Sequence, residues 1–213
     1  MSDTDDALAD QLAYYGAIAG EYDEHTIDAE GGVELFAAID GFRPFGDVLE
    51  LACGTGRWTG HLLASASSVT AVDGSTEMLD QARRRLGGDH RVEFIHADLF
   101  DWRPPKRFDA VVFGFWISHV PNDRFDSFWR MVADALAPGG VVFFFDDHHR
   151  TEAELVEGPD SSVVERRTPD GRGFRVVKIP HRPEDLAGRI DALGWIVQVS
   201  GAGEFYWGGA TRR

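Results

Sequence analysis

Cysteine and lysine are both scarce in this sequence. Among 213 residues there is one cysteine, Cys53, and there are two lysines, Lys106 and Lys178. A single cysteine excludes an internal disulfide and a structural zinc site built on cysteines. No apolar run approaches the roughly 18 residues of a membrane span, and the N-terminal segment lacks the basic end and apolar stretch of a signal peptide. We therefore expect a cytoplasmic protein with no membrane partner.

Positive charge is also in short supply. The net charge is −15, and residues 1–30 contribute −9 of it because they contain nine acidic residues and no Lys or Arg. An acidic surface repels a phosphate backbone over a Debye length of about 8 Å, so nucleic acid is not an expected partner. The hydrophobic content of 43% and the charged content of 27% are typical of a folded globular chain. The length predicts one domain over residues 1–213.

Short apolar runs alternate with amphipathic stretches through the middle of the chain. The expected strands are 47–52, 68–73, 91–97, 108–115 and 141–145, and the expected helices are 59–65, 75–86 and 125–137. The continuous apolar character of 108–115 indicates a central strand. Alternation of strands and helices predicts an α/β fold with right-handed crossovers and a mainly parallel sheet that helices cover on both faces.

The two ends of the chain depart from this alternation. Segments 163–168 and 173–179 flank a Pro-Asp-Gly-Arg turn, which predicts an inserted β-hairpin within 160–180. A helix at 183–193 and strands at 195–199 and 205–211 complete the predicted elements, for a sheet of about seven strands. Residues 1–40 are polar at first and then aromatic, and we expect them to form an N-terminal helical lid.

A glycine-rich turn, Cys53 to Gly56, follows the first predicted strand, and Asp73 ends the next one. In a doubly wound sheet, ligands bind beyond the carboxyl ends of the strands. Glycine lets the backbone approach a ligand closely, and a carboxylate one strand away can accept both hydroxyls of a ribose. The pattern therefore predicts a nucleoside site, with a purely structural turn as the alternative.

Two common nucleotide motifs do not fit. Thr59 stands where the dinucleotide fingerprint has a third small residue, and no Gly-Lys-Ser/Thr sequence is present. Four segments instead resemble the class I S-adenosylmethionine-dependent methyltransferases. They are ELACGTGRW at 50–58, AVDGSTEML at 71–79, HADLFDW at 96–102 and LAPGG at 136–140, all within a cofactor-binding core at 47–145. An NAD-type oxidoreductase and a non-catalytic nucleoside-binding member of the fold remain as alternatives.

The resemblance implies S-adenosylmethionine as cofactor and a Rossmann-like, doubly wound sheet. Asp73 is then expected on the ribose, Asp98 on the adenine amine, and Ala52 replaces a glycine that is common in this motif. The implied cofactor-binding residues are Tyr14, Glu50, Ala52, Gly54, Gly56, Asp73, Gly74, Met78, Asp98, Leu99, Phe100 and Phe115.

Histidines follow two of the predicted strands at the edge where the methyl group should emerge. An alcohol acceptor must lose its proton during attack, and a histidine with an unperturbed pKa near 6.5 suits that task. His119 is the first candidate base, with His149 and His148 as the others; a structural hydrogen bond is the alternative for His119. Asp146 and Asp147 precede these two histidines, but adjacent residues of an extended chain point to opposite faces, so at most alternate ones, such as Asp147 and His149, could share an ion. We assign no metal ligand, and a requirement for a divalent metal is left open.

The acceptor side carries aromatic and basic residues. The segments ISHVPNDRFDSFW and VERRTPDGRGFRVVKI are similar to small-molecule O-methyltransferases that act on phosphonates or sugars. This resemblance implies that Tyr22, Arg167 and Lys178 bind the substrate, with Arg166 as the alternative to Arg167. Trp116 follows the strand at 108–115 on the same edge and is expected on the substrate side, with a place in the core as the alternative. We therefore expect O-methylation of a hydroxyl, or another oxygen nucleophile, on a small polar or anionic metabolite such as a saccharide or phosphonate. The histidines favour a hydroxyl, and a homodimer is left open.

Overall fold

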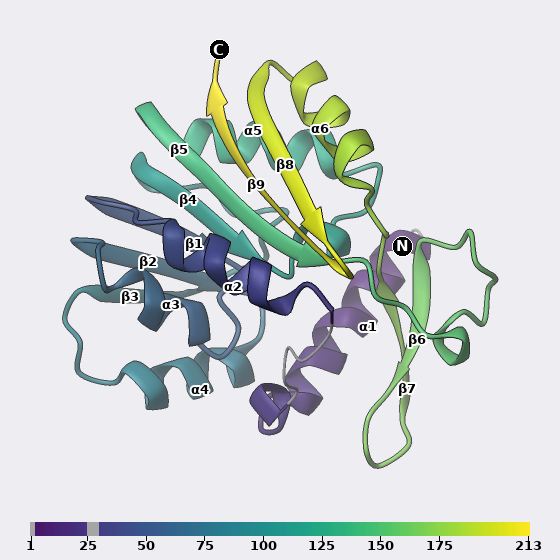
Figure 1. Ribbon diagram of the computed structural model, residues 1–213. Coiled ribbons are helices and arrows are strands. Elements are labelled where there is room, and N and C mark those ends of the chain that lie inside the picture. The colour runs from purple at the N-terminus through teal and green to yellow at the C-terminus, as the bar shows by residue number, and fades with distance from the viewer. Residues whose placement is uncertain (1–2, 25–29) are drawn as a thin grey trace.

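The computed structural model describes residues 3–24 and 30–213 (Figure 1). Its centre is a seven-stranded sheet with strand order β3-β2-β1-β4-β5-β9-β8. The strands are β1 Asp47–Leu51, β2 Ser68–Asp73, β3 Val92–His96, β4 Phe108–Gly114, β5 Leu136–Asp147, β8 Trp195–Ala202 and β9 Phe205–Arg212. Strands β1 to β5 pair in parallel, and β9 runs antiparallel to both β5 and β8. The predicted mainly parallel sheet is confirmed.

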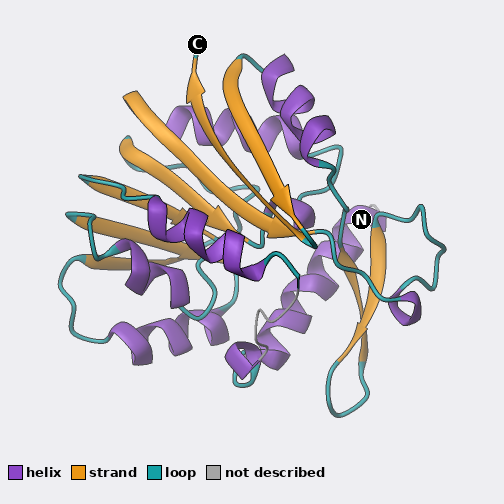
Figure 2. Cartoon of the chain, in the orientation of Figure 1, coloured by secondary structure: helices purple, strands orange, loops and turns teal. Residues whose placement is uncertain are grey.

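Helices cover both faces of this sheet (Figure 2). The helices are α1 Asp3–Ile18, α2 Gly32–Gly41, α3 Arg57–Leu62, α4 Thr76–Leu86, α5 Phe125–Ala135 and α6 Pro183–Ala192, with short 3-10 turns η1 Tyr22–Glu24, η2 Ile117–His119 and η3 Glu152–Glu154. Helix α4 begins where expected because the Ser75 hydroxyl accepts a hydrogen bond from the Met78 amide at 3.2 Å. No helix in the described part of the chain combines the length and apolar character that a membrane crossing requires.

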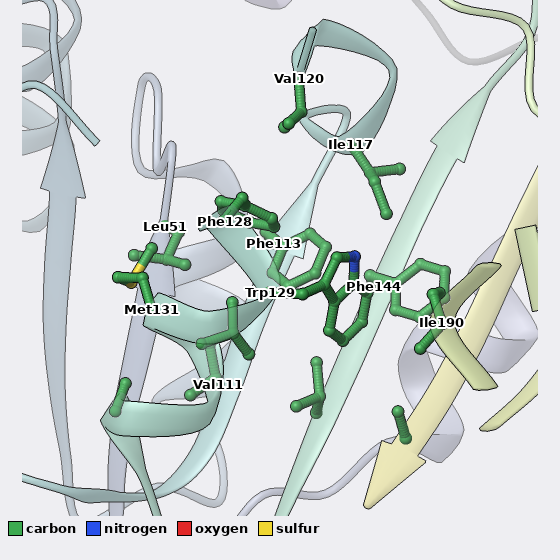
Figure 3. Packing of buried hydrophobic residues seen from close by; sticks show 14 of the residues in the cluster. Leu51, Val111, Phe113, Ile117, Val120, Phe128, Trp129, Met131, Phe144 and Ile190 are labelled. Atoms are coloured by element: carbon green, nitrogen blue, oxygen red, sulfur yellow. The ribbon is translucent and has the colours of Figure 1, made fainter. Parts of the chain in front are cut away.

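Each face of the sheet has its own apolar core. Side chains of α5 and α6 pack on one face, and side chains of α2, α3 and α4 pack on the other. On the α5 face, Phe113 and Phe144 stack with ring centroids 5.6 Å apart, and Trp129 meets both rings edge-on (Figure 3). Such aromatic pairs add about 0.5–1.5 kcal/mol beyond the burial of their surface. This packing holds the carboxyl ends of the central strands at fixed positions.

The expected and observed elements differ most around 136–140. The sequence predicts a helix that continues to residue 137 and a strand that starts at residue 141, but α5 ends at Ala135 and β5 already begins at Leu136. Leu136 pairs with Phe108, and the register shifts before the regular pairing that starts at Ala110 and Val141. The shift lets Gly139 adopt a positive φ of 79° within the strand. The proline and glycines therefore form an irregular strand start instead of a loop.

The predicted hairpin is confirmed as β6 Val163–Arg167 and β7 Gly173–Val177, which form a separate two-stranded sheet. Strand β7 packs along α1, and Figure 1 shows both beside the carboxyl ends of the central strands. Only part of the expected N-terminal lid lies there, because Leu35 and Ile39 of α2 are buried in the core under the sheet. Residues 1–2 and 25–29 of that expected lid lie outside the described residues.

Candidate active site

The turn after β1 is held by the carboxylate of Asp73. Its two oxygens accept hydrogen bonds from the amides of Gly54 and Ser75, each at 2.8 Å. Ala52 and Gly54 both have a φ of 54°, so the chain reverses sharply at this edge. Burial raises the pKa of Asp73, and the two amide hydrogen bonds oppose that rise. The same carboxylate therefore shapes the turn and borders the space beyond it.

A cavity of about 580 Å³ opens beyond this turn. The predicted cofactor residues that line it are Ala52, Gly54, Asp73, Gly74, Met78, Asp98, Leu99, Phe100 and Phe115. Trp116, predicted on the substrate side, lies in this first cavity, where its ring is 5.7 Å from that of Phe100. The guanidinium of Arg124 lies 5.0 Å from the Phe100 ring and pairs with Asp5 of α1.

The wall of the first cavity suits an adenosine group. Carboxylates at the ends of β2 and β3 can accept hydrogen bonds from ribose hydroxyls and an exocyclic amine, and the aromatic rings offer flat surfaces. The indole Nε1 of Trp116 is buried and has no hydrogen-bond partner within the described part of the chain. A buried donor of this kind is normally paired, and a ring nitrogen of adenine would supply the acceptor.

Three predicted cofactor residues lie outside the first cavity. Glu50 is buried below the turn, where it accepts a hydrogen bond from the Thr59 hydroxyl at 2.5 Å, and burial raises its pKa to about 8. Gly56 has a φ of 74°, and a Cβ there would come within 3.0 Å of the Cβ of Ala82. Both residues therefore support the shape of the turn without lining the first cavity. Tyr14 lines a second cavity instead.

The second cavity, of about 520 Å³, adjoins the first. The two share a wall made of Tyr15, Tyr22, Ala52, Gly54, Gly114, Phe115 and His119. Asp147, Glu154, Arg166 and Lys178 bring charged groups to the second cavity alone. The turn after β1, helix α1, the hairpin and the end of β5 all contribute to its lining, so this cavity forms where elements distant in sequence meet.

His119 is buried in the shared wall with both ring nitrogens occupied. Its Nδ1 lies 2.5 Å from the carbonyl oxygen of Val177, and its Nε2 lies 2.9 Å from the hydroxyl of Tyr15. Burial is the main cause that lowers the pKa of His119, and the nearby charges of Lys178 and Arg166 lower it further. The imidazole is therefore neutral at pH 7.

The structure places Arg166, not Arg167, at the second cavity. The Arg166 side chain is 19% exposed; its Nε donates to Glu154 Oε1 at 3.0 Å and its Nη1 donates to Tyr15 Oη at 3.3 Å. Arg167 is 67% exposed and pairs with Glu165 on the outer face of the hairpin. Successive strand residues point to opposite faces, so only one of the two arginines can face inward, and Arg166 replaces Arg167.

Lys178 is enclosed in a cluster of oxygen atoms. Its ammonium lies 2.8 Å from Asp147 Oδ1, 3.1 Å from Ser118 Oγ and 3.4 Å from Asp146 Oδ1. Burial raises the pKa of Asp146, and the positive charge of Lys178 opposes that rise. Lys178 therefore joins the end of the hairpin to the end of β5 while it borders the second cavity.

The two histidines after β5 occupy different places. His149 lies at the edge of the second cavity, half-exposed, with its Nδ1 3.0 Å from Glu204 Oε1. His148 lines neither cavity, and its ring lies parallel to that of Tyr206 at 6.5 Å. Among the described residues, no group of three or more His, Cys, Asp or Glu side chains could hold a metal ion.

Sequence reasoning did not select Tyr15, although it lines both cavities and contacts both His119 and Arg166. It lies 104 positions from His119 in the chain. Three tyrosines occur in residues 1–40, and only the packing of α1 shows which of them meets the histidine.

Comparison with known proteins agrees with this architecture. Residues 48–140 match a methyltransferase domain family. The structure of DhpI in complex with SAM and HEP is 40% identical, with a TM-score of 0.85 and 99% coverage of both chains. The complex of DhpI with SAH is 41% identical, with a TM-score of 0.82 and 97% coverage of both chains.

Curated relatives match over shorter stretches. Demethylmenaquinone methyltransferase of Clavibacter sepedonicus is 44% identical over 61% of this chain, which spans 55% of that protein's length. N-terminal Xaa-Pro-Lys N-methyltransferase 1 of Danio rerio is 31% identical over 71% of this chain and 69% of its own length. The matches favour a methyltransferase over an NAD-type oxidoreductase. With a seven-stranded sheet and a nucleoside cavity at its carboxyl edge, the chain belongs to the class I S-adenosylmethionine-dependent methyltransferases.

Proposed function

We propose that the chain transfers the methyl group of S-adenosylmethionine to an oxygen atom of a small polar or anionic acceptor held in the second cavity. The observation that carries this proposal is the wall that the two cavities share. A methyl donor in the first cavity and an acceptor in the second would meet at Tyr15, Phe115 and His119. The cytoplasmic location and the exclusion of nucleic acid and membrane stay predictions from composition, and a homodimer stays open.

The second cavity offers groups that suit a polar acceptor. Arg166 has guanidinium donors beyond those that contact Glu154 and Tyr15, and a guanidinium can bind an anionic group through two hydrogen bonds. Tyr22 lines the same cavity with a buried hydroxyl, whose pKa is raised by burial. Lys178 adds positive charge, but Asp146 and Asp147 balance it. Arg166 is therefore the principal candidate for binding a charged or strongly polar group, and Arg57, which lines the same cavity beside Trp58, is the other.

When bound, S-adenosylmethionine supplies an electrophilic methyl group on a sulfonium. The chain contributes binding and alignment. Asp73 and Asp98 hold the nucleoside side, while Arg166 and Tyr22 orient the acceptor. Holding two reactants in the correct geometry can supply about 7–11 kcal/mol of the barrier. Helix α1, which lines both cavities, also excludes water from the meeting point.

The test is methyl transfer from isotope-labelled S-adenosylmethionine to probes with different nucleophiles. Methyl β-glucoside offers hydroxyls, ethylphosphonate offers an ionised oxygen, and 2-aminoethylphosphonate adds an amine. We expect label on oxygen of the first two and no label on the amine of the third, identified by NMR of the products. Transfer to nitrogen alone, or cofactor binding without transfer to any oxygen, would refute oxygen methylation.

A further inference from the structure

The hydrogen-bond pattern fixes where the protons lie on His119. A carbonyl oxygen only accepts hydrogen bonds, so the contact of 2.5 Å with Val177 O requires a proton on Nδ1. The neutral ring then has a bare Nε2, which accepts the hydrogen bond of the Tyr15 hydroxyl at 2.9 Å. The phenol proton is therefore directed at the imidazole.

His119 and Tyr15 both line the two cavities, but the Nε2 of His119 is engaged by Tyr15. The Tyr15 Oη donates to His119 and accepts from Arg166 Nη1 at 3.3 Å. A hydroxyl oxygen has two lone pairs, and Arg166 occupies one of them. The second lone pair can accept a hydrogen bond from an acceptor hydroxyl. A group in the second cavity thus reaches the His119 lone pair through Tyr15.

On this geometry we propose a proton relay that serves acceptors with a neutral hydroxyl. Tyr15 contacts the acceptor, and His119 receives the proton through it. The proposal rests on the proposed oxygen methylation and names the acceptor class of the same site. As the acceptor oxygen bonds to the methyl carbon, the S–CH₃ electron pair stays on sulfur. The acceptor proton moves to Tyr15 Oη, and the Tyr15 proton moves to His119 Nε2. Atoms and charge balance, because one positive charge leaves sulfur as one arises on the imidazole.

The charge balance explains how a histidine in this environment can take a proton. The titratable groups around the pair come from several elements: Tyr14 on α1, Tyr22 on η1, Arg166 on β6, Lys178 after β7, and Asp146 and Asp147 on β5. Burial, Lys178 and Arg166 lower the pKa of His119, so its Nε2 carries no proton before the reaction. Loss of the sulfonium charge during transfer removes one more repelling cation. The proton therefore moves together with the methyl group.

Two variants test the relay with two acceptors. Tyr15→Phe keeps the ring and removes the hydroxyl. In His119→Asn, the amide nitrogen can take the place of Nδ1 and donate to Val177 O, but the side chain offers no basic nitrogen at the Nε2 position and does not take up a proton. With methyl β-glucoside we expect each variant to lower kcat by about 100-fold, and the double variant to lose little more. With ethylphosphonate, which is already ionised, we expect changes below about 3-fold because no proton is transferred.

A matched control and a pH profile separate the relay from a structural role. Tyr206→Phe removes another buried phenol hydroxyl, one that has no hydrogen-bond partner among the described residues, and should leave both reactions unchanged. Wild-type kcat with methyl β-glucoside should fall at acidic pH as His119 becomes protonated, and His119→Asn should abolish that decline. Equal losses with both acceptors, or full activity of His119→Asn on the glucoside, would overturn the relay.

The remaining outcomes distinguish the relay from the function on which it rests. Transfer to ethylphosphonate but to no hydroxyl probe would overturn the relay alone. No transfer to either probe by protein that binds S-adenosylmethionine would overturn the proposed function and the relay with it. Independently of turnover, nitrogen NMR of His119 should show an unprotonated Nε2 whose signal shifts in Tyr15→Phe but not in Tyr206→Phe. A proton on Nε2 in the wild type would contradict the relay.

Discussion

Asp73 holds the turn after β1 and lines the first cavity, so we expect it to affect cofactor binding. In Asp73→Asn, an amide group would face the amide of Gly54 or Ser75, so one donor is left opposite another. Losing a hydrogen bond to a charged group costs about 1.5–3 kcal/mol, and we expect affinity for S-adenosylmethionine to fall about 10- to 100-fold. Titration calorimetry measures this change. Asp80→Asn on the exposed side of α4 is the control, and equal affinities for both variants would contradict this role.

Arg166 and Arg167 are adjacent, of the same residue type and opposite in orientation, so they form a matched pair for testing the acceptor site. We expect Arg166→Ala to raise the KM for ethylphosphonate at least about 10-fold, because a charge-assisted hydrogen bond to the acceptor is lost. Arg167→Ala removes an exposed ion pair and should leave KM within about twofold. Steady-state kinetics measure both KM values. A larger increase in KM for Arg167→Ala than for Arg166→Ala would place the acceptor on the other face of the hairpin.

The elements were predicted better than their contacts. Residues 173–179 alternate clearly enough to predict a strand, and the observed β7 lies within them. Packing against α1 determines which face of the hairpin points inward, and no local pattern in residues 163–167 indicates that orientation. The adenosine side was more predictable, since Gly54, Asp73 and Asp98 follow consecutive strands of one sheet and share its carboxyl edge. The Tyr15–His119 contact joins two elements far apart in the chain, so it required the packed structure.

A buried side-chain amide is one of the contacts that join α1 to the hairpin. Gln11 Oε1 accepts a hydrogen bond from the backbone amide of Val177 at 3.1 Å, and both residues are buried. Gln11→Ala would leave that amide without its partner, at a cost of about 1–3 kcal/mol in the free energy of unfolding. Urea denaturation measures the loss, with Gln198→Ala on an exposed position of β8 as control. Similar stability of the two variants would show that the Gln11 hydrogen bond adds little to the other contacts that hold α1 against the hairpin.

At the scale of the whole molecule, the pH dependence of stability depends on carboxyl groups that the fold buries, such as Glu50 below the turn after β1. Burial raises the pKa of Glu50 from 4.5 to about 8. Between these values the folded chain retains a proton that the unfolded chain has released, so the free energy of unfolding falls as pH rises. Burial raises the pKa of Asp73 and Asp146 as well, which adds to the same trend. The buried His181, whose pKa is lowered to about 4, opposes it below pH 6.5 because the unfolded chain binds that proton more tightly.

Glu50→Gln isolates one contribution to this balance. Titrating groups that do not interact with Glu50 cancel in the difference between variant and wild type, and the charge of Asp73, which raises the pKa of Glu50, is part of the measured effect. Without cofactor, the unfolding free energy of the variant relative to wild type should rise by about 1.4 kcal/mol per pH unit between pH 4.5 and 8 and then level off. Any fixed cost of burying the amide shifts this curve without changing its slope. Urea denaturation at half-unit steps of pH measures the slope, with Glu93→Gln on β3 as a control for removal of a carboxyl group. A flat difference for Glu50→Gln would mean that Glu50 stays ionised in the folded protein, with its charge compensated beneath the turn.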